Sequence, residues 1–246
     1  MRRAKNFAFD IVAEALWPTR CAICDKPGFV ICDDCSEHID YIDILSSCPR
    51  CGSPYGSVQC CECNDAAIDA IGLDSFPFDR LASAVRIDDD SKRLVTVYKD
   101  HDEHRLAPLI AKTMSRYINP DWIDDTNNAE SDQTFITFIP ATAEALNRRG
   151  FDHMEKIAEL VAKYAHLRSL SVFERPKSLD QRKLNRRERA KNMKQKFQIR
   201  ADVELPSKLI VVDDICTTGS TMFGAALSLR EGGCEKLFGL TFGKVC

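Results

Sequence analysis

The sequence predicts an α/β fold, a parallel sheet flanked by helices, preceded by a small cysteine-rich module. Apolar runs suited to strands alternate with stretches of helical spacing from about residue 80 onward. Nine of the 12 cysteines lie between residues 21 and 63, ahead of that α/β part. We therefore expect two domains within the 246 residues, one over residues 1–66 and one over residues 67–246.

Composition points to a soluble globular protein. The formal net charge is -3 and 44% of the residues are hydrophobic. Near the start of the chain Asp10 and Glu14 interrupt the apolar stretch, which favours a short amphipathic helix over a signal peptide. No stretch approaches the roughly 18 to 20 apolar residues that span a membrane. We expect a cytoplasmic protein without a membrane span.

The cysteines repeat one plan twice. Each half is a C-x2-C pair followed by a second C-x2-C pair, which leaves Cys61 over. The halves are Cys21, Cys24, Cys32 and Cys35, then Cys48, Cys51, Cys60 and Cys63. Four thiolates in two knuckles are typical of closed, structural Zn²⁺ sites, so two zinc ribbons are predicted. One occupied site, disulfides, or an interleaved pairing of the knuckles stay open as alternatives.

Further elements follow in order along the chain. "LASAVRID" alternates like a strand, and "RLAPLIAKTMSRYI" has helical spacing. Residues 119–133 form an acidic polar loop, after which "TFITFIP" predicts a buried strand. "ATAEALNRRGFDHMEKIAELVAKYAHL" then passes through a basic turn into a long amphipathic helix. In a parallel sheet the ends of these strands lie close together, so Arg148 and Arg149 are expected to face any ligand bound there.

The stretch "IVVDDICTTGST", residues 210–221, predicts a strand, a tight loop and the start of a helix. The loop offers hydroxyls at a helix N-terminus, which suits a phosphate. The hydroxyl and glycine positions are Thr217, Thr218, Gly219, Ser220 and Thr221. Asp213 and Asp214 suit ligand hydroxyls or Mg²⁺, which prefers oxygen ligands. Cys216 lies inside this stretch. It is interpreted either as a reactive thiol near a helix N-terminus or as a small residue that fills a tight turn.

This order of residues resembles the phosphoribosyl diphosphate signature of type I phosphoribosyltransferases. The resemblance implies a type I phosphoribosyltransferase-like sheet that binds phosphoribosyl diphosphate with Mg²⁺. In that comparison Asp213 and Asp214 would bind the ribose hydroxyls, and residues 217–221 would cradle the 5-phosphate. An ordinary acidic strand end before a helix cap is the alternative.

Basic residues are concentrated between residues 175 and 200, where eleven Lys or Arg stand against Asp180 and Glu188. The segment is interpreted as a hood over an anionic ligand or as a surface for single-stranded nucleic acid, with a solvated helix face as the alternative. The candidate residues are Arg182, Lys183, Arg186, Arg187 and Arg189.

Nearly the full chain resembles the ComF family. The matching parts are the cysteine repeat, "YKDHDEHRLAPLIA", "IPATAEALNRRGFDH", "RPKSLDQRKLNRRERAKN" and "LIVVDDICTTGST", in the order of that family. The chain departs from it in two places: Asp152, His153 and Met154 follow "RGF" where Asn-Gln-Ala is common, and "IPAT" replaces Pro-Val-Pro.

The resemblance implies a phosphoribosyl diphosphate-binding protein that takes part in the uptake or handling of single-stranded DNA, with proteins of the DNA-uptake machinery as possible partners. A catalytically active, Mg²⁺-dependent phosphoribosyltransferase of nucleotide salvage is the alternative, and a zinc-ribbon interaction module is a third reading. The salvage enzyme requires a nucleobase pocket, and no segment after "LFGLTFGKVC" is expected to build it.

Overall fold

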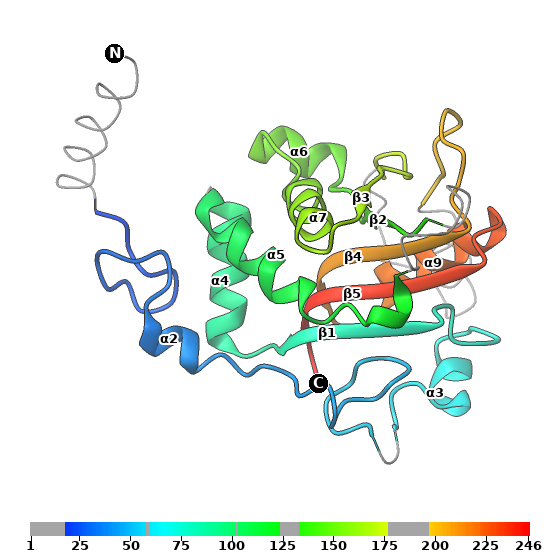
Figure 1. Cartoon of the computed structure of the whole chain (residues 1–246), viewed down its shortest axis with the longest axis horizontal. Helices are drawn as coiled ribbons and strands as arrows, with labels where there is room; N and C mark the ends of the chain where they lie inside the picture. Colours follow the sequence, from blue (N-terminus) through cyan, green and yellow to red (C-terminus); the bar gives the residue numbers. More distant parts are fainter. Residues whose placement is uncertain (1–17, 58–59, 102, 124–132, 177–196) are drawn as a thin grey trace.

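The computed structural model describes residues 18–57, 60–101, 103–123, 133–176 and 197–246. A parallel sheet forms its centre, as Figure 1 shows. The strands are β1 (Arg80–Arg86), β2 (Phe135–Phe138), β3 (Arg168–Ser169), β4 (Lys208–Cys216) and β5 (Lys236–Lys244). The helices are α2 (Asp33–Glu37), α3 (Asp65–Ala70), α4 (Asp89–Asp100), α5 (Ala107–Ser115), α6 (Ala143–Arg149), α7 (His153–Tyr164) and α9 (Ser220–Glu231), with 3-10 turns η1 (His104–Leu106) and η2 (Pro120–Trp122).

The sheet has the strand order β1-β5-β4-β2-β3, and every pairing is parallel. The predicted fold class, a parallel sheet flanked by helices with a small cysteine-rich module before it, is confirmed. β4 lies between β5 and β2, so the carboxyl end of β2 opens beside that of β4. The same edge of the sheet therefore carries both strand ends for which ligand contacts were predicted.

The apolar run of β4 serves both faces of the sheet, because successive side chains of a strand point to opposite sides. Ile210 and Val212 pack with residues of α4, α5 and α7 in one hydrophobic cluster. Leu209 and Val211 pack with residues of α9 in the other. All four are fully buried, which explains why the run is continuous rather than alternating.

The sequence places Asp213 and Asp214 at the end of a strand. β4 runs through both residues to Cys216. β5 extends as far as Lys244 and pairs with β4 along its whole length, up to the register pair Cys216 and Lys244. The neighbouring strand thus keeps the acidic residues in extended conformation, and the loop begins only at residue 217.

Local capping explains where the helices at this edge begin and end. Thr142 caps α6 by accepting from the backbone N–H of Ala145, and Asp152 caps α7 in the same manner. α6 ends at Gly150, which adopts the left-handed conformation with φ 77°. The predicted basic turn is therefore a short helix and a glycine stop, after which α7 starts in a new direction.

The cysteine-rich module lies against the β1 edge of the sheet. Ile42 N–H donates to the carbonyl of Ala84 at 3.0 Å, and Arg86 N–H donates to the carbonyl of Asp40 at 2.8 Å. Leu81 N–H donates to the carbonyl of Arg50 at 2.9 Å, so the module covers an edge that would otherwise be unpaired. The predicted domain boundary between residues 66 and 67 lies within α3 and stays a prediction. Within the described ranges, none of the helices has the length and apolar character required to cross a membrane.

Candidate functional site

A cavity of about 220 Å³ opens at the carboxyl ends of β4 and β2. The two acids of β4 and Thr221 at the start of α9 line it on one side. The loop after β2 and the first residues of α7 line it on another. Its charged or ionisable lining residues are Lys99, Arg149, His153, Asp213 and Asp214. The cavity therefore joins the predicted acidic pair to three basic side chains from other elements.

Asp214 binds two basic side chains at once. Nζ of Lys99, from α4, contacts Asp214 Oδ2, and Nε2 of His153 lies 2.9 Å from the same oxygen. The second carboxylate oxygen accepts from the backbone N–H of Ile215 at 2.6 Å. Burial acts to raise the pKa of Asp214, but the hydrogen bond from His153 and the charge of Lys99 outweigh it, so the pKa lies well below its usual range. Asp214 is thus a firmly ionised carboxylate.

His153 is oriented from both sides of its ring. Arg149 Nη1 lies 3.4 Å from His153 Nδ1. A guanidinium only donates hydrogen bonds, so Nδ1 accepts and the Nε2–H group donates to Asp214. The hydroxyl of Tyr98 donates to the carbonyl of His153 at 2.8 Å, which fixes the first turn of α7 against α4. Residue spacing in the sequence predicts no partner for His153, and the structure supplies Asp214.

Asp152 holds the start of α7 in place beside the cavity. Its side chain is completely buried, and it accepts from the backbone N–H groups of Met154 at 3.1 Å and Ala141 at 3.0 Å. Arg175 Nη1 donates to Asp152 Oδ2 at 2.6 Å. One carboxylate therefore connects the loop after β2, the first turn of α7 and the chain beyond β3. This residue and its neighbour His153 form the segment in which the chain departs from the ComF pattern.

The loop after β4 keeps its hydroxyls at the surface. Thr217, Thr218 and Ser220 are exposed, and the side-chain oxygens of Thr218 and Ser220 lie 2.8 Å apart. Gly219 is the N-cap of α9 with φ 75°, and among the described residues no side chain caps this helix. A Cβ at Gly219 would stand 2.5 Å from the ring of Phe223, so the position requires glycine. Such a helix start suits an anion.

The two arginines of the predicted basic turn are placed differently. Arg149 lines the cavity, and its side chain is 14% exposed. Arg148 is 65% exposed and lies 3.8 Å from Asp100. Arg149 also reaches Asp100, at 2.9 Å. The structure thus brings Arg149 to the acidic pair and leaves Arg148 at the surface.

Cys216 is buried at the end of β4. Burial raises the pKa of its thiol above the ordinary value. This favours the reading of a small residue that fills the turn over that of a reactive thiol.

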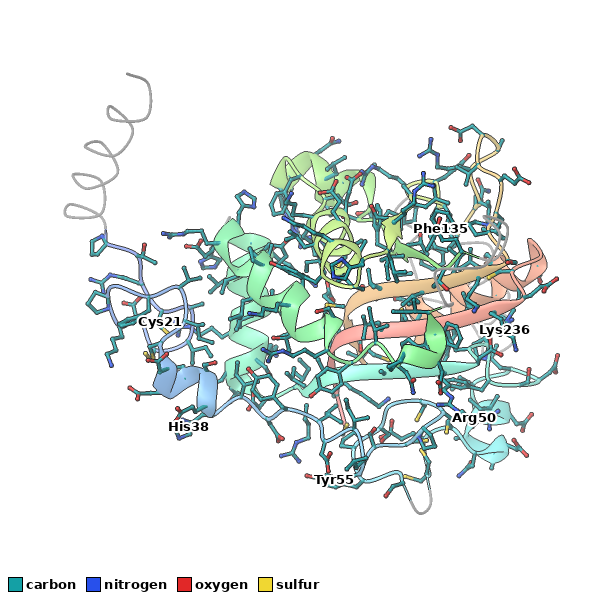
Figure 2. All side chains as sticks on the ribbon, viewed as in Figure 1. Cys21, His38, Arg50, Tyr55, Phe135 and Lys236 are labelled. Atoms are coloured by element: carbon teal, nitrogen blue, oxygen red, sulfur yellow. The ribbon has the colours of Figure 1, made fainter. Side chains whose placement is uncertain are left out.

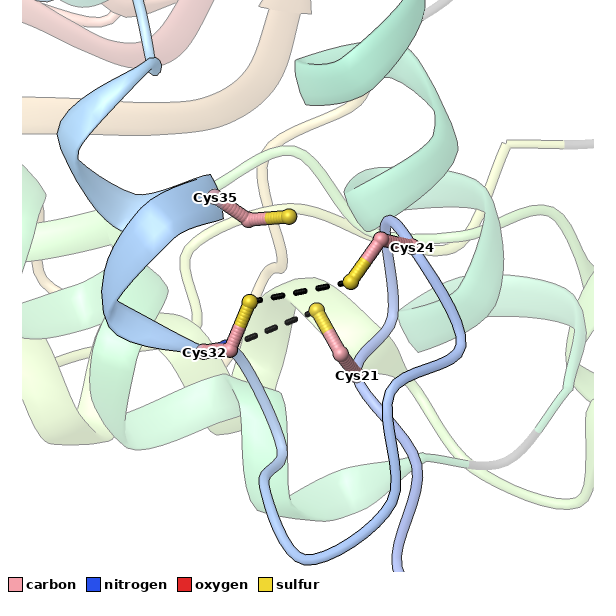
Figure 3. A group of neighbouring side chains, drawn as sticks. All are labelled: Cys21, Cys24, Cys32 and Cys35. Carbon is pink, nitrogen blue, oxygen red and sulfur yellow. Dashed lines mark hydrogen bonds between the residues drawn. The ribbon is translucent and has the colours of Figure 1, made fainter.

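The first predicted cysteine group is assembled from residues 21 to 35. Figure 3 shows the side chains of Cys21, Cys24, Cys32 and Cys35 pointing toward one another. Their sulfur atoms all lie within 4.8 Å of one another. The sulfur atoms of Cys24 and Cys32 lie 3.6 Å apart. Tetrahedral Zn–S bonds place sulfur atoms about 3.8 Å apart. This group therefore fits Zn²⁺.

The second group has the same form. The sulfur atoms of Cys48 and Cys63 are 3.6 Å apart and those of Cys51 and Cys60 are 3.5 Å apart. Cys21 and Arg50, labelled in Figure 2, mark the two groups at separate places along the module. All twelve cysteines are free, and the knuckles pair sequentially rather than in an interleaved manner. Two four-thiolate sites are present, as predicted, and disulfides are not formed.

The predicted basic residues between 182 and 189 lie outside the described residues, namely Arg182, Lys183, Arg186, Arg187 and Arg189. At the near end of that basic segment, Arg175 is described and binds Asp152.

The parallel sheet and the signature at the end of its central strand resemble those of type I phosphoribosyltransferases, and two four-cysteine groups accompany them. The chain is similar to "Competence protein ComFC" of Streptococcus pneumoniae (strain ATCC BAA-255 / R6), with 24% identity over 205 residues, 83% of this chain and 83% of that protein. This match confirms the resemblance to the ComF family. No family model matches the chain.

Shorter matches and one structural match accompany it. "Hydrogenase maturation factor HypA" of Beijerinckia indica is 39% identical over 51 residues, and that of Paracoccus denitrificans is 41% identical over 54 residues. These matches span 45% and 47% of the two relatives. Among solved structures, orotate phosphoribosyltransferase from Aeropyrum pernix has a TM-score of 0.29 at 17% identity, over 65% of this chain and 79% of that chain.

Proposed function

We propose that the chain binds phosphoribosyl diphosphate with Mg²⁺ at the carboxyl end of β4. The observation that carries the proposal is that the acidic pair and Thr221, in the first turn of α9, line one cavity. The exposed hydroxyls of Thr217, Thr218 and Ser220 directly precede Thr221 in the chain. The loop would hold the 5-phosphate and Asp213 and Asp214 would hold the ribose hydroxyls. Mg²⁺ would neutralise diphosphate charge, and carboxylate oxygens of the acidic pair are the ligands it prefers.

Basic side chains at the cavity support an anionic ligand. Lys99 and Arg149 bring two positive charges to the lining of the cavity that the acidic pair also lines. Without them, two carboxylates would repel a phosphorylated sugar. Lys99 is bound to Asp214 in this structure, so its charge balances the site until the ligand arrives.

Calorimetric titration with phosphoribosyl diphosphate and Mg²⁺ tests the proposal. The loop variant Thr218→Val with Ser220→Ala changes exposed side chains, so it should fold normally. Each hydrogen bond to a charged phosphate contributes on the order of 1.5 to 3 kcal/mol, so the variant should bind about tenfold more weakly or worse. Thr96→Val, at an exposed threonine of α4, is the matched control. Unmeasurable binding by the wild-type protein, or equal affinity in the loop variant, would contradict the assignment.

We further propose that the protein acts in the uptake or handling of single-stranded DNA. The support is the similarity to a competence protein and the eleven basic residues between residues 175 and 200. If these side chains neutralise DNA phosphates, log affinity should fall with log salt at about -0.7 per contact. Replacing Arg182, Lys183, Arg186 and Arg187 by Ala should flatten that slope by up to about four contacts. Anisotropy titrations across salt concentrations measure it, and an unaltered slope would remove the DNA-handling function.

A second candidate function is turnover as a Mg²⁺-dependent phosphoribosyltransferase of nucleotide salvage. The pair of His153 and Asp214 at the same cavity favours it, because a histidine held by a carboxylate is a common general base. Nδ1 of His153 would have to exchange its contact with Arg149 for the attacking nitrogen. Screening nucleobases for diphosphate release, with His153→Asn compared to wild type, tests this candidate. No release with any base would leave the binding function alone.

A further inference from the structure

Lys244, the last residue of β5, is a buried cation with a defined partner. Only 5% of the residue is exposed. Its Nζ lies 2.8 Å from Oε2 of Glu62. The other oxygen of Glu62 accepts from the hydroxyl of Ser53 at 2.7 Å. A buried ammonium requires such an arrangement, because an unpaired charge in this place would be strongly destabilising.

The partner of Lys244 belongs to the second cysteine group. Glu62 stands between Cys60 and Cys63, and Ser53 follows Cys51 by two residues. Four thiolates around Zn²⁺ carry a net charge of about -2. A lysine beside such a centre offsets that charge, as outer partners of metal ligands commonly do. The carboxylate of Glu62, 2.8 Å from Nζ, stabilises the ammonium form of Lys244 in this buried place.

On its other side Lys244 adjoins the start of the hydroxyl loop. Lys244 and Cys216 are register partners in the pairing of β5 with β4. The backbone N–H of Val245 donates to the carbonyl of Cys216 at 3.0 Å. Cys216 is 4% exposed and immediately precedes Thr217. Lys244 therefore lies between two features: the ion pair with Glu62 of the second cysteine group, and Cys216, the residue before the loop of residues 217–221.

We propose that Lys244 is a positioning residue that couples the second cysteine group to the loop of residues 217–221. With Zn²⁺ in the group, Glu62 and Lys244 are held together and Cys216 stays packed. Loss of the metal or of the ion pair loosens the end of β5 and with it the loop. The consequence for phosphate affinity rests on the proposed function, whereas the consequences for the cysteine group and for Cys216 do not.

The first cysteine group offers a matched control. Lys26 lies 3.3 Å from Asp34 within that group, and both side chains are exposed. The group lies against α4, where Arg93 Nε donates to the carbonyl of Ala22 at 3.0 Å. Lys26→Met thus removes a lysine–carboxylate pair beside four cysteines without altering the end of β5.

The experiment compares zinc-loaded wild-type protein with Lys244→Met, Glu62→Gln and Lys26→Met. Zinc transfer to a chromophoric chelator is followed, and alkylation of individual cysteines by iodoacetamide is resolved by peptide mass spectrometry. Lys244→Met and Glu62→Gln should each speed zinc loss from the second group by about 10- to 100-fold. Alkylation of Cys216 should accelerate together with that of Cys51 and Cys60, while Cys21 is unaffected. Lys26→Met should leave Cys216 protected.

Two results overturn the coupling. One is an unchanged rate of Cys216 alkylation in both Lys244→Met and Glu62→Gln; the other is equal acceleration of Cys216 alkylation by Lys26→Met. Glu62→Gln keeps shape at a side chain that is 34% exposed, so it remains informative if Lys244→Met fails to fold. Lys244→Met and Glu62→Gln should also bind phosphoribosyl diphosphate with Mg²⁺ about tenfold more weakly than the wild-type protein does, as measured by titration. If wild type binds none while Cys216 responds as expected, the proposed function fails and the coupling stands.

Discussion

Single side chains at the cavity have energetic roles that go beyond ligand contact. Asp214 is the clearest case, because its carboxylate neutralises Lys99 and orients His153, and the side chains of Lys99 and Asp214 are only 19% and 13% exposed. Removing one member of a buried ion pair leaves the other uncompensated, which costs on the order of 3 to 5 kcal/mol. The same residue that is proposed to bind ribose is thus a structural residue of the unliganded protein.

This gives a prediction for Asp214→Asn. At pH 7 the variant should lose on the order of 3 kcal/mol of unfolding free energy. A carboxyl whose pKa is lowered on folding contributes stability above its unfolded pKa of about 3.9, and that contribution is lost as pH falls below this value. The difference between wild type and variant should therefore shrink below about pH 4. Urea unfolding at several pH values measures it.

The control is Asp202→Asn. Asp202 pairs with Arg200 at 2.7 Å, but the two side chains are 68% and 40% exposed. Screening by water makes such an exposed pair contribute little to stability. A loss at pH 7 in Asp214→Asn no greater than that in Asp202→Asn would show that the buried network contributes little.

At the level of elements, the start of α9 depends on one glycine. Gly219 combines a left-handed backbone with a ring contact, since its missing Cβ would meet Phe223. That ring is itself held edge-on by Phe76, with ring centroids 5.5 Å apart. Gly150, which ends α6, has a similar φ of 77° with nothing near its missing Cβ. A side chain at Gly150 would therefore carry only the conformational cost of a positive φ. A side chain at Gly219 would carry the same cost and a steric clash with Phe223 as well.

Gly150→Ala should lower the unfolding free energy by about 1 to 2 kcal/mol, the cost of placing an L-residue in the left-handed region. Gly219→Ala should cost about 1 to 3 kcal/mol more, because the ring of Phe223 must also move. Denaturant titration compares the two variants directly. Equal losses would mean that the start of α9 adapts freely, and the steric argument for glycine in the loop would be wrong.

For the whole molecule, the two cysteine groups act as parts of the hydrophobic core. Cys21 and Cys32 belong to the cluster on one face of the sheet, and Cys48, Cys51 and Cys63 belong to the cluster on the other. Metal binding at either group should therefore stabilise the sheet as well as the module. This differs from two ribbons that fold and unfold independently of the α/β domain.

Zinc content should be about two per chain, since there are two four-thiolate sites. Cys21→Ser and Cys51→Ser should each reduce it to about one and lower the melting temperature of the whole protein in a single transition. Cys61→Ser, at the exposed cysteine outside both groups, should change neither quantity. Metal analysis and calorimetry check this. A separate low-temperature transition for the module would indicate independent folding instead.

Much of this architecture is predictable from local patterns. The continuous apolar run and the residues after it predict β4, its loop and α9, because burial on both faces and helix start signals are local properties. Cysteine spacing predicts both four-thiolate groups, because a knuckle is formed by neighbours in the chain. β5 received no prediction, although it is an interior strand of the sheet, between β1 and β4. Its glycines and mixed polar residues give no clear strand period.

The sequence by itself determined the fold class, the acidic pair before the hydroxyl loop and the four cysteine knuckles, whereas the sequential pairing of the knuckles was decided by the structure. Only the tertiary structure decided which distant side chains meet: Lys99 and His153 at Asp214, Arg175 at Asp152, and Lys244 at Glu62. Each of these pairs joins different elements, and helix orientation and strand register bring them together. Local periodicity carries no information about helix orientation or strand register. The charged side chains that surround the candidate site are therefore identified only from the packed tertiary structure.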